Sequence, residues 1–229
     1  MTPVSDAAEP PVRASAAKLR VLDAAMRLFG ERGYEATSIA QIEEAAGLRP
    51  GSGGLYRHFG SKRDVLEQGI EHVLASRRDV FETLDVVPVG TTQAEFGTQL
   101  RALAEAGMAR LDHDRDLSRI MLRDLRELPD LARLVRRQEV DAVTAALAAW
   151  LRGWIVGESG ARESAADENA AGESGVDTDA VASVVVSAIS HYWTMVDATG
   201  EAPLEMERAR FVDALVTMVE RVIAVPRPN

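Results

Sequence analysis

Side chains that could contact nucleic acid gather in one stretch of the sequence, SIAQIEEAAGLRPGSGGLYRHFGSK, which runs from Ser38 to Lys62. Hydroxyl, imidazole and cationic groups donate hydrogen bonds to phosphate oxygens and to base edges, the two kinds of contact that make up protein–DNA interfaces. The donors that we expect to contact DNA are Thr37, Ser38, Arg49, Ser52, Tyr56, His58 and Lys62. They can act together only if a small set of helices presents them on one surface.

The pattern around these donors predicts two short helices joined by a glycine-rich turn. Ser38 followed by Gln41 is a capping-box signature that begins a helix. One face of that helix is apolar at helical spacing, through Ile39, Ile42, Ala45 and Ala46. Gly47 ends the helix, and residues 50–54 resist regular structure until a short helix resumes at Leu55. This order is typical of a helix-turn-helix, whose second helix enters the major groove.

The flanking residues predict the helices that hold this pair. Upstream, an apolar stripe ends at Gly30 and Gly33, and it consists of Leu19, Val21, Leu22, Ala25, Met26, Leu28 and Phe29. Downstream, Ser61 with Asp64 at its third helical position predicts the capped start of another helix. The sequence therefore predicts a small helical headpiece.

The joint spacing of VLDAAMRLFGERGYEATSIAQIEEAAG and GGLYRHFGSK resembles the DNA-binding domain of the TetR family of bacterial transcription regulators. The resemblance covers Leu19 to about Lys62, roughly a fifth of the 229 residues. It implies an all-helical homodimer whose N-terminal domains bind a palindromic operator in double-stranded DNA, and whose C-terminal domain binds a small molecule that releases the DNA. It also implies phosphate contacts for Tyr56, His58 and Lys62, because their spacing to Phe59 matches the family pattern.

One departure from the family pattern concerns the turn. Residues 48–54 make it about two residues longer than is usual, and Gly54 stands where a threonine often precedes the Leu-Tyr pair. We therefore expect Arg49, Ser52 or backbone N–H groups of the turn to read more of the DNA. A flexible loop without a contact role is the alternative for the glycine run, and core packing is the alternative for Tyr56.

Composition limits the classes of function. With 46% hydrophobic residues the chain can bury a sizeable core, and without cysteine it has no disulfide or thiolate metal site. No metal and no cofactor are predicted, because the four histidines lack metal-ligand spacing. An apolar signal segment is missing at the N-terminus, and no run approaches the roughly 18 apolar residues of a membrane helix. We therefore expect a cytoplasmic protein that does not enter the membrane.

Charge is distributed unevenly along the chain. Nine basic and six acidic residues lie between Arg13 and Leu66, a net charge of +3 that leaves −13 for the rest of a chain whose total is −10. A locally positive end is what binding to nucleic acid requires, and the acidic remainder would repel DNA and help to orient the molecule.

The whole chain is predicted to be all-α, with an N-terminal three-helix domain that contains the helix-turn-helix, followed by a helical ligand-binding and dimerisation domain. We expect a disordered tail over residues 1–15, the DNA-binding domain over 16–62, and the second domain over 63–229 with a disordered acidic loop at about 157–175. Helices are predicted over about 61–84, 93–111, 117–125 and 129–154, followed by two apolar helices near the C-terminus.

The last two helices are apolar around much of their circumference, and such helices must bury that surface. A four-helix contact between two copies of the chain would do so. The resemblance places the dimer interface in the same helices. The predicted interface residues are Val185, Ile189, Tyr192, Phe211, Leu215, Met218 and Val222.

A ligand pocket is expected in the second domain, where aromatic and methionine side chains could line an apolar cavity with a few polar groups. The candidate lining residues are Phe96, Met108, Met121, Trp150, Trp154, His191 and Trp193. Plain core packing is the alternative for each of them, and an interface position is a further alternative for His191. The unknown inducer is expected to be apolar.

We predict a ligand-responsive transcriptional regulator that represses until its inducer binds, and not an enzyme. One alternative is a helical module that binds a ligand or a protein and has lost DNA binding through its glycine-rich turn. Another alternative is an enzyme that uses a pair of carboxylates. The acidic group around His113 is explained by a hydrated turn between helices.

Overall fold

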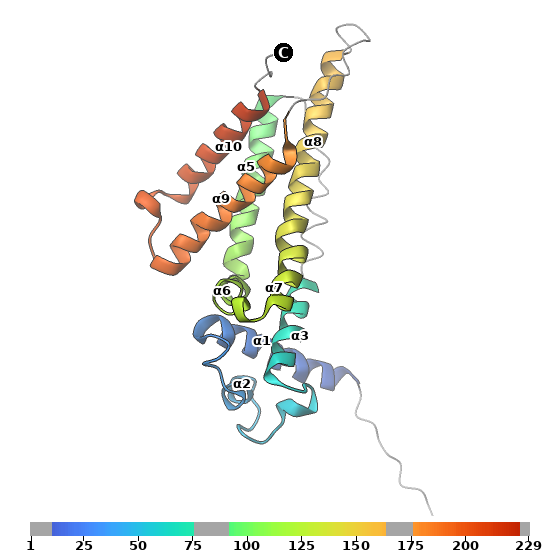
Figure 1. Cartoon of the computed structure of the whole chain (residues 1–229), viewed down its shortest axis with the longest axis vertical. Helices are drawn as coiled ribbons and strands as arrows, with labels where there is room; N and C mark the ends of the chain where they lie inside the picture. Colours follow the sequence, from blue (N-terminus) through green and yellow to red (C-terminus); the bar gives the residue numbers. More distant parts are fainter. Residues whose placement is uncertain (1–10, 76–91, 164–175, 225–229) are drawn as a thin grey trace, which may run out of the picture. The chain divides into compact units, whose positions relative to one another are not determined.

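The computed structural model describes residues 11–75, 92–163 and 176–224, and in these ranges it contains helices and turns but no strand. This confirms the all-α prediction. The chain divides into two compact units, one with residues 1–76 and 114–135 and the other with residues 77–113 and 136–229. Figure 1 shows the order of the helices along the chain.

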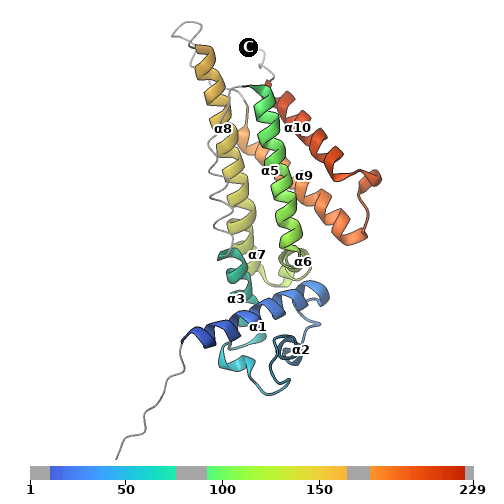
Figure 2. The same ribbon diagram turned by 180° about the vertical axis from the view of Figure 1, so that it is seen from behind.

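Unit one combines an N-terminal segment of the chain with a second segment from its middle. Its α-helices are α1 (Pro11–Arg32), α2 (Ile39–Ala45), α3 (Lys62–Ala75), α6 (Arg115–Arg123) and α7 (Pro129–Val135), with one-turn 3₁₀ helices η1 (Leu55–Arg57) and η2 (Leu125–Glu127). Helix α1 packs against α2, α3 and α6. It crosses in front of the smaller helices in the view from behind (Figure 2).

The core of unit one differs from the domain predicted over residues 16–62. Apolar side chains of α6 and η2, including Leu117, Ile120 and Leu125, are buried in the same cluster as Phe29 and Ile42. Helix α3 also continues into this unit as far as Ala75. The apolar face of α6 shows in the sequence, but the surface on which it packs does not.

Local signals in the sequence predicted the helix ends well. Ser38 caps α2 in a complete capping box with Gln41. Gly33 and Gly47 follow α1 and α2 with φ of 101° and 74°, a left-handed conformation that glycine adopts without strain. The tail predicted to be disordered up to residue 15 is helical from Pro11, and residues 1–10 lie outside the described ranges.

Unit two is built from α5 (Gln93–His113), α8 (Ala142–Glu163), α9 (Thr178–Thr199) and α10 (Arg208–Ala224). A π-helical segment η3 (Arg136–Asp141) leads into α8, and the short η4 (Pro203–Glu205) lies between α9 and α10. Helix α8 packs on α9, while α5 contacts both α9 and α10 (Figures 1 and 2).

The predicted helix over 93–111 corresponds to α5, but the long helix predicted over 129–154 differs from the structure. It is interrupted by η3, and α8 continues to Glu163. Residues 157–163, predicted as the start of a disordered loop, are therefore helical, and their alanine, glutamate and arginine residues favour helix. Residues 164–175 of that loop, and the predicted extension of α3 to residue 84, lie outside the described residues.

A search of the described helices finds none with the length and apolar character needed to span a bilayer.

Candidate nucleic-acid interface

The reading turn, defined here as residues 48–54, has a folded backbone. Gly51 and Gly53 both have φ of 71°, which a residue with a Cβ atom rarely adopts. Within the turn, the backbone N–H and the hydroxyl of Ser52 donate to the carbonyl of Arg49, at 3.2 and 2.7 Å. The glycines therefore allow a specific hydrogen-bonded shape, unlike the flexible loop that was the alternative for this run.

The polar side chains of the turn and of η1 lie on the surface. Arg49, Ser52 and Arg57 are exposed, and Tyr56 leaves 57% of its surface open to solvent. The adjacent Leu55 is fully buried. The predicted second helix is thus a single 3₁₀ turn anchored by Leu55 and Phe59, and the exposed ring of Tyr56 disagrees with core packing.

Two other predicted donors are less free. His58 is half-buried beside Phe59, with the two ring centroids 6.3 Å apart. The hydroxyl of Ser38 accepts from the backbone N–H of Gln41 at 3.3 Å and donates to the Gln41 side chain at 3.1 Å. Ser38 remains exposed, so its oxygen can still face a ligand while it caps α2.

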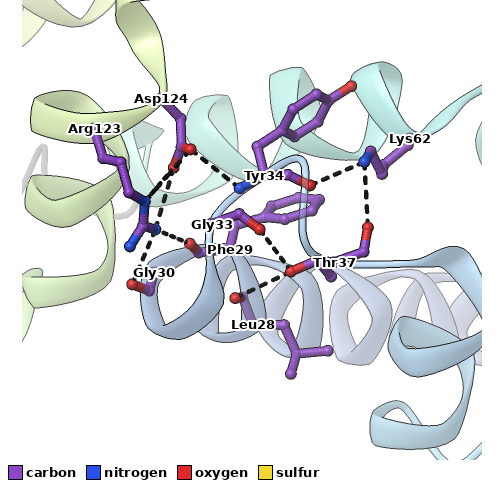
Figure 3. Close-up of polar contacts among 9 residues, drawn as sticks. All are labelled: Leu28, Phe29, Gly30, Gly33, Tyr34, Thr37, Lys62, Arg123 and Asp124. Atoms are coloured by element: carbon purple, nitrogen blue, oxygen red, sulfur yellow. Dashed lines mark hydrogen bonds and ion pairs between the residues drawn. The ribbon is translucent and has the colours of Figure 1, made fainter.

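Thr37, predicted to contact DNA, is instead an internal residue. Its side chain is 1% exposed, and its hydroxyl lies 3.2 Å from the carbonyl of Leu28 and 2.8 Å from that of Gly33 (Figure 3). The hydroxyl thus directs its single proton toward carbonyls at the C-terminal end of α1 and just beyond it. In the sequence, Thr37 precedes the N-cap residue Ser38 and looks available to contact DNA, but in the fold its side chain points into the core.

Lys62 holds the connection between α1 and α2. Its ammonium donates to the carbonyls of Tyr34 and Thr37 at 2.9 and 3.2 Å, and it lies 4.3 Å from the centroid of the Tyr34 ring (Figure 3). These bonds engage the cation predicted to contact a phosphate. The structure therefore gives Lys62 a role in positioning the segment that leads into Ser38.

Replacement of Lys62 by methionine keeps the apolar stem and removes the ammonium. We expect it to lower the free energy of unfolding of unit one by about 1–2 kcal/mol, because two carbonyls and the Tyr34 ring lose their cation. Urea unfolding followed by circular dichroism measures this loss. Arg63→Met is the control, since Arg63 forms a solvent-exposed pair with Glu67 and its loss should change stability little. Equal stability of the two variants would contradict the anchoring role.

The same connection is held from the opposite side by the last residue of α6 and by the residue that follows it, neither of which was predicted from the sequence. The Arg123 guanidinium donates to the carbonyls of Phe29 and Gly30 at 2.5 and 3.2 Å, and the Asp124 carboxylate accepts from the backbone N–H of Tyr34 at 3.2 Å (Figure 3). More than 85 residues separate these partners, so no local pattern indicates the contact.

The start of α3 is capped as predicted. The Ser61 hydroxyl accepts from the backbone N–H of Asp64 at 3.0 Å. Hydrogen bonds from the Gln68 side chain and the Gly60 backbone hold the pKa of the Asp64 carboxyl below its ordinary value. This end of α3 is therefore satisfied by its own side chains.

The predicted ligand residues do not form one site. Five of them belong to the core of unit two, namely Phe96, Met108, Trp150, Trp154 and Trp193. The ring of Phe96 lies 5.3 and 5.2 Å from those of Trp150 and Trp154, so these aromatics pack directly on one another. Met121 packs against the core of unit one instead, and His191 is exposed.

A concavity of about 410 Å³ is found elsewhere, at the connection between α9 and α10. It is lined by Tyr192, Val196, Met206 and Arg208 together with Glu201, Ala202, Glu205 and Glu207. None of the residues predicted to bind the ligand lines it. The aromatic residues of unit two were predicted to line a cavity, but they fill the core of the helical bundle instead.

Of the seven predicted dimer residues, four are buried, two are exposed and Phe211 is half-buried. Val185, Ile189, Tyr192 and Leu215 are buried within unit two itself, and the Tyr192 ring stacks on that of Phe211 at 4.4 Å. Met218 and Val222 are exposed, as is Val184, which the sequence analysis did not name. Four of the seven residues are therefore buried in the protomer's own core, because α9 and α10 have apolar residues on two sides and the sequence does not show which side faces inward.

Comparison with known proteins supports the helix-turn-helix. Residues 21–68 match the family model of bacterial regulatory proteins of the tetR family. This segment, which contains the helix-turn-helix, is therefore similar to regulators of the tetR family. The transcriptional repressor KstR2 of Rhodococcus jostii is 43% identical over 54 residues, which span 24% of this chain and 26% of KstR2. The matched segment therefore spans about a quarter of the length of KstR2.

Solved structures match over nearly the whole length. A TetR-family regulator of Mesorhizobium loti superposes with a TM-score of 0.65 at 18% identity, covering 92% of this chain and 98% of that one. The regulator FadR of Bacillus subtilis, solved in complex with stearoyl-CoA, gives a TM-score of 0.53 at 17% identity, covering 90% and 96%. At such identities the likeness shows that both units share the fold of these regulators.

Proposed function

We propose that this chain is a TetR-family transcriptional repressor that binds operator DNA as a homodimer in the cytoplasm and leaves it when an apolar small molecule binds. The observation that carries the proposal is the presentation of Arg49, Ser52, Tyr56 and Arg57 on the surface of one short segment. Buried Leu55 and Phe59 fix that segment to the core, so the exposed donors have a defined direction. A DNA-binding site requires hydrogen-bond donors whose positions are fixed by the surrounding structure.

The proposed DNA contacts follow from exposure. Arg49 and Ser52 of the reading turn contact base edges or the adjacent backbone, while Tyr56, Arg57 and His58 contact phosphates. Ser38 adds a contact at the start of α2. Thr37 and Lys62 act through the connection that they hold.

The proposed dimer uses the apolar sides of α9 and α10 that face solvent. On α9 the residues at this face are Val184, Ala188, His191 and Met195. On α10 they are Ala214, Met218 and Val222, together with the half-buried Phe211, whose ring also stacks on Tyr192 of its own protomer. Both sets recur at intervals of three or four residues, which places each set on one stripe of its helix. A second copy of the chain would cover both stripes and place two reading turns at half-sites about 34–36 Å apart.

The proposed ligand is apolar because the core of unit two is rich in aromatic residues and the FadR neighbour was solved with an acyl-CoA. Binding would have to part packed rings such as those of Phe96 and Trp150. A ligand that prefers the altered packing would shift the protein toward a state in which the two reading turns no longer match the half-sites. No enzymatic activity is part of the proposal.

A gel-shift experiment with the DNA upstream of the chain's own gene tests the proposal. We expect retention that is selective for one duplex over a scrambled duplex, with a logarithmic affinity that falls by about 0.9 per phosphate contact for each tenfold rise in salt. No retention at low salt would instead support a module that has lost DNA binding. A ligand that binds the protein without changing operator affinity would be excluded as the inducer.

A further inference from the structure

Glu43 is the only charged side chain that is fully buried in the part of the chain that the structure describes. One of its carboxylate oxygens accepts from the backbone N–H of Gly51 at 2.7 Å, and the other accepts from that of Leu55 at 3.1 Å. Its own carbonyl accepts from the N–H of Leu48 at 2.8 Å. One residue of α2 therefore bonds the beginning and the middle of the reading turn and the residue that follows it.

The bond to Leu55 supplies a cap that the local sequence lacks. The first N–H groups of a helical turn have no partner inside it, and the residue before the helix usually provides an oxygen. Here that residue is Gly54, and it makes no side-chain cap. Since Leu55 is fully buried, water does not reach its N–H group, and Glu43 meets the need from another helix.

The arrangement is mutually dependent. A buried carboxylate is very unfavourable unless hydrogen bonds replace its hydration. The two N–H groups that replace it here point at Glu43 only in this conformation of the turn, with Gly51 at a φ of 71°. The carboxylate thus selects one shape among the many that a run of glycines could adopt.

We infer that Glu43 is the positioning residue that sets the shape of the reading turn and, through it, the sequence selectivity of DNA binding. This inference rests on the proposed function. Arg49 and Ser52 lie on either side of the anchored Gly51, and Tyr56 follows the anchored Leu55. Release of both anchors would leave these side chains present but without a fixed direction.

Glu43→Gln tests the inference. The glutamine side chain has only one acceptor oxygen, so its NH₂ group would face the N–H group of either Gly51 or Leu55, and that hydrogen bond would be lost. We expect selectivity, measured as the ratio of affinities for operator and scrambled duplex, to fall about tenfold or more. Affinity for the scrambled duplex should stay unchanged relative to the control Glu44→Gln. Glu44 is the exposed neighbour and gives the same change of charge, so the comparison removes the effect of charge itself. Equal selectivity in the two variants would overturn the inference.

Amide hydrogen exchange followed by NMR gives a reading that does not depend on DNA. In the unsubstituted protein we expect the Gly51 amide to exchange slowly although Gly51 is exposed, and to exchange at least about tenfold faster in Glu43→Gln. Amides in the middle of α1 should not change, which separates loss of the turn from loss of the fold. Rapid exchange of Gly51 in the unsubstituted protein would overturn the anchoring itself. If the unsubstituted protein selected no duplex, the proposed function would be contradicted. Slow exchange of the Gly51 amide would still show that Glu43 anchors the reading turn.

Discussion

Met218→Glu is expected to make the chain monomeric and to weaken operator binding by about 10²- to 10⁴-fold, the contribution that linkage of two binding modules makes to affinity. Met218 is 61% exposed in the protomer and lies at the centre of the apolar stripe of α10. In the proposed dimer, a glutamate there would place a charge in an apolar contact without a partner. Sedimentation velocity measures the association, and gel shift measures the affinity.

The control for this variant is Thr217→Glu, which adds the same charge to the same helix. Thr217 is exposed, lies about 100° further around α10, and donates its hydroxyl to the Asp213 carbonyl of its own helix. We expect it to remain dimeric and to bind operator nearly as well as the unsubstituted chain. A dimeric Met218→Glu protein with full affinity would show that the contact between copies uses another surface.

Gly30→Ala is expected to lower the stability of unit one by about 1–3 kcal/mol, the usual cost of forcing extra atoms into a packed contact. A Cβ atom at Gly30 would lie 2.4 Å from a carboxylate oxygen of Asp116 and 2.7 Å from its Cα atom. Burial at this contact between α1 and α6 also raises the pKa of Asp116. Because alanine normally stabilises a helix interior by up to about 1 kcal/mol relative to glycine, a loss would identify the contact with α6 as the cause.

The measurement can separate the two units. All three tryptophans, at positions 150, 154 and 193, belong to unit two, so their fluorescence follows that unit alone. Amide exchange in α1 and α3 reports on unit one, where the loss is expected. Gly69→Ala is the matched control, because its Cβ would meet only the flexible Met26 side chain, at 2.7 and 2.9 Å. Equal losses in both variants would contradict a rigid contact between Gly30 and Asp116.

Hydrogen bonds between near neighbours were predicted correctly from the residues. The capping box of Ser38 and Gln41, the cap at Ser61, and the glycine stops after α1 and α2 all appear where the pattern placed them. Each of these features depends on residues three or four positions apart. The same short spacings carry the resemblance to the TetR family.

Roles that depend on the direction of a side chain were predicted less well. Glu43 and Glu44 look alike in the sequence, but one is fully buried and the other is exposed. Thr37 looks like a surface donor and is buried, and Val185 looks like an interface residue but fills the core of its own protomer. In each case the partner lies on another element of the same unit.

The sequence by itself therefore determined the helical class, the helix-turn-helix and its resemblance to the TetR family, because helix ends and apolar periods depend on interactions within a few residues. The tertiary structure alone decided that Lys62 and Arg123 hold the connection after α1, that Glu43 anchors the reading turn, and which sides of α9 and α10 remain exposed. The physical reason is that a helix with two apolar sides, or a polar residue next to a turn, has several equally good local arrangements. Burial against a distant element then selects one of them.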